Sequence, residues 1–261
     1  MTLLAVDDLS KAFGGVRAID GVSFTIGRGA VHSIIGPNGA GKTTLLNLLT
    51  GLVEPDRGHI RLQGRELAGL PAHRFAAVGI GRTFQNLQVF FNMTALENVM
   101  TGRHLLERDA LWATLVRARS LVRSEAATRE RAHELLAQVG LADWADEMAD
   151  AMPYGALKRL EIARALAAEP RLLLLDEPAA GLNATEAHDI DALIKQLAAE
   201  GTTVVLVEHN MKLVMGVSDH LLVLDQGRKL AEGTPQQIRD NAAVVEAYLG
   251  AVDAIGEGAH A

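Results

Sequence analysis

Residues 36–44 read Gly-Pro-Asn-Gly-Ala-Gly-Lys-Thr-Thr, which matches the phosphate-binding pattern G-x-x-x-x-G-K-[ST] at every fixed position. The glycines allow the backbone to wrap around an anion with its N–H groups pointing inward. The ammonium of Lys42 supplies a charge for the β- and γ-phosphates, and the hydroxyl of Thr43 can bind Mg²⁺. The stretch predicts a nucleotide-binding loop with the contact residues Gly36, Asn38, Gly39, Ala40, Gly41, Lys42, Thr43 and Thr44.

The residues on either side of this loop fit a strand–loop–helix unit. Residues 31–35 are mostly apolar and predict a buried strand entering the loop, and residues 43–49 predict a helix leaving it. Such a helix points the positive end of its dipole at the bound phosphates. This context favours a true phosphate-binding loop over a glycine-rich turn that contains Lys-Thr by chance.

The bulk composition is that of a globular protein. The chain has 261 residues, of which 49% are hydrophobic and 22% charged, enough for an α/β core with a smaller lobe. A net charge of −7 argues against nucleic acid as the principal partner. The absence of cysteine excludes disulfides and Cys-ligated metals. The N-terminus lacks the basic region of a signal peptide, and no apolar run is long enough to span a bilayer.

Hydrophobic patterning divides the chain into strand-rich and helix-rich parts. Three segments bounded by turn residues predict half-buried antiparallel strands: residues 3–9, 17–26 and 58–64. Residues 94–141 are poor in glycine and predict an inserted helical lobe, with apolar residues near helical spacing at Leu111, Leu115, Val122, Leu135, Leu136 and Val139. Continuous apolar runs return at residues 171–175 and 202–207, and each predicts a buried parallel strand.

These segments predict an α/β fold class, in which a mixed sheet with an antiparallel N-terminal β-subdomain carries an inserted helical subdomain. Residues 221–225 and 228–232 predict a hairpin across Gln226-Gly227. We place the core at residues 1–91 and 169–250 and the helical subdomain at residues 92–168. Residues 251–261 are small and polar and predict a flexible tail.

Two adjacent acids follow the apolar run at residues 171–175. Residues 172–175 are four leucines that deliver Asp176 and Glu177 to the carboxyl edge of the sheet, where α/β proteins bind ligands. Hydrolysis of a nucleotide needs a carboxylate for the Mg²⁺ shell and a group that orients the attacking water. We therefore predict that Asp176 holds Mg²⁺ through water and that Glu177 polarises the nucleophilic water. A solvated acidic turn is the alternative for this motif taken alone.

Two polar residues complete the predicted catalytic set. His209 follows the apolar run 204–207 and also reaches the carboxyl edge, where it can donate a hydrogen bond to a γ-phosphate. Gln85 stands just before the helical lobe, and its amide can reach Mg²⁺ or the water. A lone His or Gln is usually structural, but here both accompany a phosphate loop and an acidic pair. The predicted catalytic residues are Glu177, His209 and Gln85, and the predicted metal ligands are Thr43, Gln85 and Asp176.

In order and spacing, these motifs resemble the ATP-binding subunits of ABC transporters over residues 3–250, and residues 180–183 resemble that family's D-loop. The resemblance implies a P-loop NTPase core of the ABC type, with ATP and Mg²⁺ as ligands. It also implies a head-to-tail dimer with a second ATP-binding subunit, either identical or paralogous. Phe13 stands where the family places an aromatic ring on adenine, and we favour that role over a place in the core.

The signature motif departs from the family pattern. The family reads Leu-Ser-Gly-Gly-Gln, whereas residues 152–156 read Met-Pro-Tyr-Gly-Ala. Residues 157–166 fit the following helix, so we expect Tyr154 and Gly155 to contact the nucleotide held by the other subunit. Pro153 replaces the Ser and removes a hydroxyl and a backbone donor. Because one charge-assisted bond is worth about 1.5–3 kcal/mol, we expect weakened or partner-dependent closure with hydrolysis retained.

The altered signature, together with residues 82–86, 93–99, 208–215 and 233–238, resembles the ATPases of branched-chain amino acid importers. This resemblance implies two permease subunits, an indirect solute-binding protein and a place in the cytoplasm on the inner face of the cell membrane. Closure would reach the permease through Gln85 and residues 90–97. Relatives that serve urea, short amides or lipopolysaccharide remain alternatives, because an ATPase subunit does not touch the solute.

Two further points stay open at the level of sequence. Three apolar residues either form a docking surface for the permease or belong to the core of the helical lobe: Phe90, Phe91 and Met93. A nucleotide-gated regulatory module with little hydrolysis is the rival function, supported only by Pro153 and Ala156. A DNA-repair or translation ATPase of the same superfamily would carry long coiled coils or tandem cassettes, and this sequence has neither.

Overall fold

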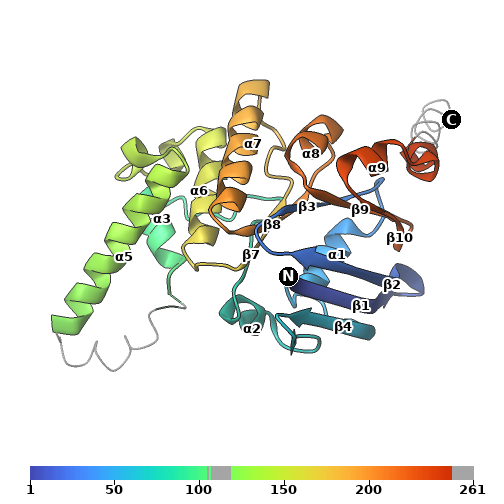
Figure 1. The fold of residues 1–261 in the computed structure, drawn as a ribbon. Coiled ribbons are helices and arrows are strands. Elements are labelled where there is room, and N and C mark those ends of the chain that lie inside the picture. Colours follow the sequence, from blue (N-terminus) through green and yellow to red (C-terminus); the bar gives the residue numbers. More distant parts are fainter. Residues whose placement is uncertain (105, 107–118, 249–261) are drawn as a thin grey trace.

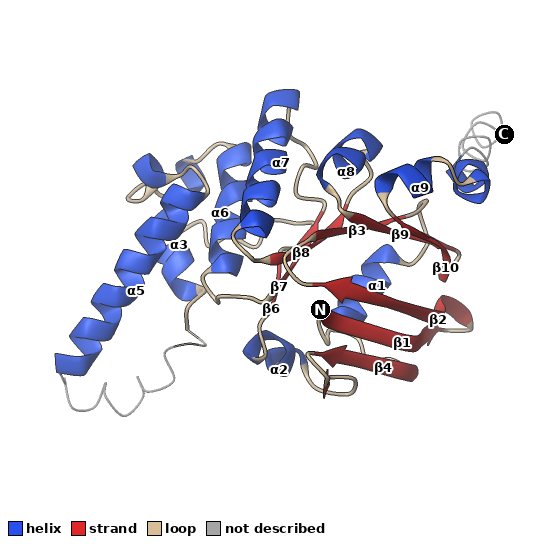
Figure 2. Ribbon diagram, viewed as in Figure 1, coloured by secondary structure: helices blue, strands red, loops and turns tan. Residues whose placement is uncertain are grey.

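The computed structural model describes residues 1–104, 106 and 119–248, which form two β-sheets surrounded by helices (Figures 1 and 2). The strands are β1 Thr2–Phe13, β2 Val16–Gly27, β3 Val31–Ile35, β4 Arg57–Leu62, β5 Arg65–Glu66, β6 Ile80–Arg82, β7 Leu172–Asp176, β8 Thr203–Val207, β9 His220–Asp225 and β10 Arg228–Gly233. The helices are α1 Lys42–Leu49, α2 Ala72–Ala77, α3 Ala95–Thr101, α5 Arg119–Gln138, α6 Tyr154–Leu166, α7 Ala184–Ala199, α8 Met211–Val217 and α9 Pro235–Arg239.

The smaller sheet is antiparallel and has the strand order β2-β1-β4-β5. Apolar side chains alternate along its strands and gather on one face, as the register pairs Leu4 with Ile26 and Val6 with Phe24. The three antiparallel strands predicted for the first 64 residues are confirmed, and β1 and β2 extend beyond the predicted bounds.

The larger sheet has the order β10-β9-β3-β8-β7-β6, with β10 antiparallel to β9 and the other strands parallel. The parallel strands share one carboxyl edge, so the ends of β3, β8 and β7 lie side by side although they are far apart in sequence. The predicted hairpin is confirmed, because β9 and β10 pair across Gln226 and Gly227. This edge positions the site.

Helix α1 lies between the two sheets (Figure 1) and joins them into one core. Its four buried leucines pack with residues of both sheets: Leu45, Leu46, Leu48 and Leu49. Strand β7 is buried on both faces, since Leu172 and Leu174 belong to the α1 cluster while Leu173 and Leu175 pack with α6 and α7. A strand covered on both faces explains the uninterrupted leucine run.

Helices α3, α5 and α6 pack together at one end of the larger sheet, so the predicted helical lobe is present (Figure 1). A capping box fixes the start of α3, with Thr94 accepting from the backbone of Glu97 and the Glu97 carboxylate accepting from the backbone of Thr94. Leu135, Leu136 and Val139 are buried there as predicted. The predicted positions Leu111 and Leu115, the side chain of Val122 and the predicted tail lie outside what the structure describes.

The fold class predicted from the sequence is confirmed: a mixed α/β core, an antiparallel N-terminal sheet and a helical insertion. Among the described helices, none has the length and apolar character needed to cross a membrane.

Candidate functional site: a nucleotide cleft beside the phosphate loop

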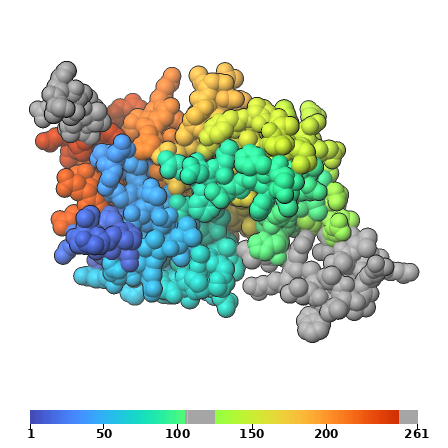
Figure 3. Space-filling view, turned by 180° about the vertical axis from the view of Figure 1, so that it is seen from behind, coloured from blue at the N-terminus to red at the C-terminus, as the bar shows by residue number. Residues whose placement is uncertain are grey.

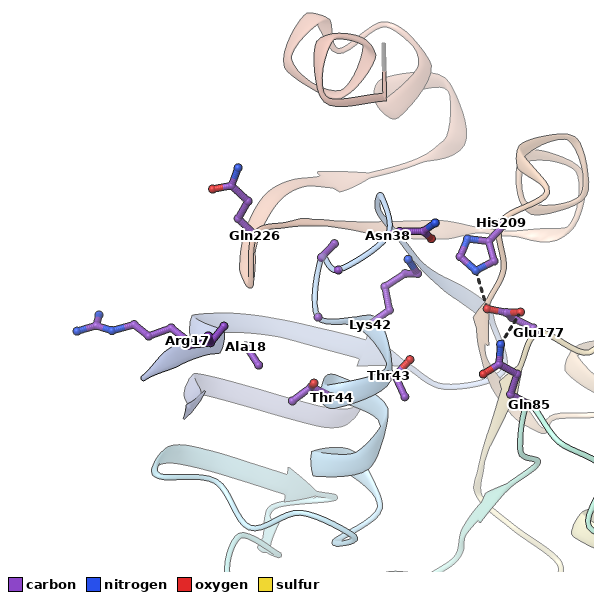
Figure 4. A pocket seen from close by; sticks show the side chains of 14 residues that line it. Arg17, Ala18, Asn38, Lys42, Thr43, Thr44, Gln85, Glu177, His209 and Gln226 are labelled. Carbon is purple, nitrogen blue, oxygen red and sulfur yellow. Dashed lines mark hydrogen bonds and ion pairs between the residues drawn. The ribbon is translucent and has the colours of Figure 1, made fainter. Parts of the chain in front are cut away.

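A cleft of about 700 Å³ opens over the phosphate loop at the carboxyl edge of the larger sheet (Figure 4). Most of the residues predicted from the sequence line it: Asn38, Gly39, Ala40, Gly41, Lys42, Thr43, Thr44, Gln85, Glu177 and His209. These side chains come from four separate segments, which the fold brings to one edge of the sheet. The cleft is therefore the candidate site.

The phosphate loop is held tightly against the antiparallel sheet. Gly41 caps α1 with a left-handed φ of 101°, and a Cβ at that position would lie 2.4 Å from the carbonyl oxygen of Ala18. Only glycine fits both the backbone conformation and the close approach. The β9–β10 turn supports the loop from the other side, since the Gly227 N–H donates to the Ala40 carbonyl over 3.1 Å.

The ammonium of Lys42 lies within the loop that precedes it. Its Nζ donates to the carbonyl oxygens of Gly36 over 2.8 Å and Pro37 over 3.0 Å. Burial lowers the pKa of Lys42, and the charges of Glu177 and Asp176 oppose that shift. Because an ammonium has three donors, one remains for an anion in the cleft.

Glu177, His209 and Gln85 meet at one side of the phosphate loop, beside Lys42 (Figure 4). The Nε2 of His209 lies 2.5 Å from Glu177 Oε1, and the amide of Gln85 donates to Glu177 Oε2 over 3.3 Å. Glu177 has a φ of +50°, a conformation that residues other than glycine seldom adopt outside functional sites and tight turns. The three predicted catalytic residues therefore form one hydrogen-bonded group.

Asp176 is placed differently from its neighbour. It ends β7 with its carboxylate buried, and its Oδ2 accepts from the guanidinium of Arg82 over 2.9 Å. Arg82 also donates to Asn47 over 2.7 Å and to Thr50 over 3.2 Å, both near the end of α1. Asp176 thus lies behind the cleft lining, and an arginine that the sequence reasoning did not single out is its partner.

Phe13, Tyr154 and Gly155 are not among the residues that line this cleft. Phe13 ends β1 opposite Val16 and is 48% exposed, with Lys11 above its ring, so it is not a core residue. Tyr154 and Gly155 begin α6 instead. A Cβ added at Gly155 would lie 2.6 Å from Glu186 Oε1, which shows how closely α6 approaches α7 there.

Four residues that the sequence reasoning missed also line the cleft: Val16, Arg17, Ala18 and Gln226. The first three start β2, and Gln226 lies in the β9–β10 turn. Their position depends on long-range contacts such as the bond from the Asp20 N–H to the Gly227 carbonyl, 2.8 Å long. The only local signal for Gln226 is the turn at Gln226-Gly227, which does not say what the turn approaches.

The fold and the phosphate loop define a nucleotide-hydrolysing protein of the phosphate-loop class. A family model described as "ABC transporter" matches residues 19–180, and one described as "Branched-chain amino acid ATP-binding cassette transporter" matches residues 228–254. The chain belongs to the ATP-binding family of ABC transporters, and it is an ATPase of that family.

Several curated proteins are similar over nearly the whole chain. The high-affinity branched-chain amino acid transport ATP-binding protein BraF of Pseudomonas aeruginosa is 48% identical, covering 95% of this chain and 98% of the relative. The protein LivG of Escherichia coli, described in the same words, is 44% identical with the same coverage. The lipopolysaccharide export system ATP-binding protein LptB of Acidithiobacillus ferridurans is 37% identical, covering 95% and 97%.

Solved structures agree with this assignment. A nucleotide-free ATP-binding cassette from an ABC transporter has a TM-score of 0.82 at 33% identity, covering 95% of this chain and 99% of that chain. A cassette in its ADP conformation has a TM-score of 0.82 at 32% identity, covering 96% and 99%. A dimeric post-hydrolysis cassette bound to ADP and phosphate has a TM-score of 0.75 at 27% identity, covering 89% and 99%.

Proposed function

We propose that this chain hydrolyses ATP at the cleft over Lys42 and thereby powers an importer of branched-chain or other hydrophobic amino acids. The observation that carries the hydrolytic role is the meeting of Glu177, His209 and Gln85 in the cleft beside the phosphate loop. The names of BraF and LivG support branched-chain amino acids as the solute class. The description of the family model that matches residues 228–254 names the same solutes.

The proposed reaction is attack of water on the γ-phosphorus. Glu177 accepts a proton from the water, the new O–P bond forms, the bond to the bridging oxygen breaks, and ADP leaves. His209 holds the Glu177 carboxylate in position and can donate to the γ-phosphate. Lys42 and the backbone N–H groups of the loop stabilise the charge on the phosphates. Phe13, exposed beside Val16, is proposed to stack on adenine.

The chemistry of the donor set fits Mg²⁺, which prefers oxygen ligands. Thr43 offers a hydroxyl and Gln85 an amide oxygen, both at the lining of the cleft, and Asp176 offers a carboxylate of which Oδ2 is bonded to Arg82. These three residues would hold the ion, which would neutralise phosphate charge during hydrolysis. Among the described residues no group of three or more acidic or histidine side chains is arranged to hold a metal ion. Water and phosphate oxygens would complete the ligand set beside the three residues named above.

The cleft is one half of the proposed active site. Tyr154 and Gly155 stay outside it, and Tyr154 is 45% exposed at the start of α6. We propose that they contact the nucleotide of a second ATP-binding subunit, identical or paralogous, in a head-to-tail dimer. Similarity to the dimeric post-hydrolysis cassette supports this arrangement. The division into a core of residues 1–91 and 169–250 and a helical subdomain of residues 92–168 belongs to the same proposal.

The junction of the core with the helical subdomain, at residues 90–97, is proposed to dock the permease at the cytoplasmic face of the membrane. The complete transporter would hold two permease subunits, with a solute-binding protein acting on the far side. Phe90 and Phe91 are 45% and 48% exposed, which favours docking over packing within the lobe. Both follow Gln85 within one short segment. Nucleotide contacts at Gln85 would therefore be transmitted to the permease as a shift between open and closed dimers.

The Glu177→Gln variant tests the proposed hydrolysis. The amide cannot take a proton from water but keeps the shape of the side chain, so ATP should still bind while turnover falls by at least about a hundredfold. Steady-state phosphate release, with and without the permease, measures the effect. Equal turnover by the wild type and the variant would remove the case for an enzyme and favour the regulatory module.

The solute is tested separately from hydrolysis. A strain lacking this chain should lose uptake of radiolabelled leucine and recover it when the chain is restored. Urea uptake and lipopolysaccharide export serve as the comparison arms. Loss of either in place of leucine uptake would assign the chain to that alternative transporter.

A further inference from the structure

One face of α6 carries three charged side chains at intervals of three residues: Lys158, Glu161 and Arg164. Lys158 and Glu161 are 2% and 3% exposed, and burial lowers the pKa of Arg164. Burying charged groups is costly unless they are paired and hydrogen-bonded. Since α6 begins at the altered signature motif, the partners of these charges connect that motif to the rest of the molecule.

The partners lie on the segment that contains Gln85. A single oxygen of Glu161, Oε1, accepts the backbone N–H of Phe84 over 3.2 Å and that of Gln88 over 3.4 Å. These two residues flank Gln85 on its two sides. A single carboxylate on α6 therefore holds both ends of the short loop that presents Gln85 to the cleft.

Lys158 and Arg164, the two neighbouring charged residues of α6, also contact residues 84–90. Lys158 Nζ donates to the carbonyl oxygen of Gln85 itself over 3.4 Å. The guanidinium of Arg164 lies 5.4 Å from the centre of the Phe90 ring, within the range of a cation–π contact. In Figure 3 the part of the chain near residues 80–100, in teal and green, lies between the blue N-terminal strands and the yellow-green helices. The segment thus crosses the junction between the core and the lobe while attached to α6.

Burial raises the pKa of Glu161, whereas the bond from Phe84 and the charges of Lys158 and Arg164 act in the opposite direction. A buried acid kept in this position needs its donors, and loss of the carboxylate would leave two backbone N–H groups without an acceptor.

We propose that Glu161 is a positioning residue that fastens the Gln85 loop to the signature helix, so that Gln85 and the Tyr154 end of α6 change position together. This inference rests on the proposed function, in which Gln85 acts at one nucleotide and Tyr154 contacts the nucleotide of the partner subunit. Nucleotide bound beside Gln85 would then affect the nucleotide site of the partner subunit, because the single helix α6 connects the two. Such an effect is a coupling free energy between two sites.

Hydrogen exchange of the full chain tests the connection without reference to turnover. In the wild type, ATP should slow backbone exchange in residues 84–88 and in the first turn of α6 together. In Glu161→Gln, which keeps one acceptor oxygen and removes the charge, exchange in residues 84–88 without nucleotide should rise about tenfold, because two bonds to a charged acceptor are weakened. The ATP response of the first turn of α6 should no longer follow that of residues 84–88.

Kinetics of the chain assembled with its permease provide the second readout. The KM for ATP should stay within about twofold of the wild-type value because the phosphate loop is untouched, while kcat and the solute carried per ATP should fall by about threefold or more. The control is Glu130→Gln, the same change at an exposed position on α5, which should leave all these values unchanged. A general loss of folding would instead lower the fraction of active protein and leave the solute carried per ATP unaltered.

The outcomes separate this inference from the proposed function. If the wild type shows no turnover, the proposed function fails, yet the exchange measurement still decides whether the connection exists. If the wild type turns over ATP and Glu161→Gln keeps both linked exchange and the wild-type transport ratio, the inference is wrong. Should Glu161→Gln fold poorly, Lys158→Gln serves as the second variant. It weakens the bond to the Gln85 carbonyl and also removes the cation over the Tyr154 ring and a charge beside Glu161. This variant must loosen the same loop for the inference to stand.

Discussion

At the scale of single residues, the site is organised by charges that neutralise one another behind the cleft. Arg82 and Asp176 are each 6% exposed at the side chain, and Arg82 also donates to Asn47 and Thr50. One guanidinium thus connects β6, β7 and α1, the three elements that surround the acidic pair. We infer that Arg82 fixes the direction of the Asp176 carboxylate before any nucleotide arrives.

Removing the Arg82 guanidinium should therefore lower the free energy of unfolding strongly. Arg82→Met leaves a buried carboxylate without its partner, and we expect a loss of roughly 3–5 kcal/mol in the free energy of unfolding. Chemical denaturation at neutral pH measures this value. The control Arg131→Met breaks an exposed pair with Glu134 on α5 and should change it by less than about 1 kcal/mol.

The same pair offers an internal check. In Arg82→Met/Asp176→Asn the uncompensated charge is gone, so the double variant should be more stable than Arg82→Met alone. If the double variant is equally unstable, the cost comes from lost packing and bonds to α1, and the charge-pair interpretation is wrong.

At the scale of elements, the start of α6 is where this chain differs from its family's pattern. Pro153 is the N-cap residue with extended φ and ψ of −65° and 155°, values that proline adopts without strain, and it offers no side-chain cap. The helix nevertheless begins at Tyr154, because burial of residues such as Leu157 and Leu160 stabilises it by packing. The altered motif keeps the helix and removes a donor.

Restoring that donor should favour the closed dimer. In a Glu177→Gln background, which keeps ATP bound, Pro153→Ser should lower the ATP concentration for half-maximal dimer formation by about tenfold, the value of one charge-assisted hydrogen bond. Analytical ultracentrifugation across an ATP titration measures it. Pro71 gives a matched control, since it caps α2 with φ and ψ of −70° and 153° and also lacks a side-chain cap.

Pro71→Ser should therefore leave the dimerisation curve unchanged, even if it stabilises α2. A Pro153→Ser curve that coincides with the parent curve would mean that the Ser hydroxyl is not a contact to the nucleotide in this branch of the family.

At the scale of the whole molecule, a histidine pair lies where the two sheets approach each other. His32 of β3 and His220 of β9 have ring centres 5.7 Å apart, and His32 Nε2 accepts the Gly27 N–H over 3.1 Å. Burial, followed by the charge of His220, lowers the pKa of His32 to about 4 from its usual 6.5, although Asp219 and Glu232 oppose the shift. The bond agrees with this direction, because a protonated Nε2 could not accept it.

Stability should consequently fall on acidification. The unfolded chain binds a proton at His32 below about pH 6.5 and the folded chain only near pH 4, so the contribution is complete above pH 6.5 and is lost between those values, by about 3 kcal/mol in total. Urea unfolding of the wild type and His32→Gln at pH 7.5 and pH 5 measures the part of this loss that lies above pH 5, about 2 kcal/mol, which the variant should lack. His73→Gln, at an exposed position, should retain the wild-type pH dependence; an identical pH dependence in all three proteins would contradict the assignment.

The sequence alone determined the parts whose signals are local. The phosphate loop needs glycines and Lys42 in fixed order, the leucine run before Asp176 predicts a buried strand, and the composition of residues 94–141 predicts the helical lobe. Each of these depends on neighbours within about ten residues, and the family resemblance that they carry is confirmed by BraF and LivG.

Tertiary structure decided which distant groups meet. His209 and Glu177 are 32 positions apart in the sequence, and Arg82 and Asp176 are 94 positions apart. Gly227 of the turn and Ala40 of the loop are 187 positions apart. Glu161 lies 73 and 77 positions from its partners Gln88 and Phe84. No local pattern encodes such pairings, because they follow from the order of strands in the sheet and the packing of α6 against it. Tyr154 and Gly155 lie outside the cleft, and their predicted contact with the nucleotide of a second subunit stays a prediction.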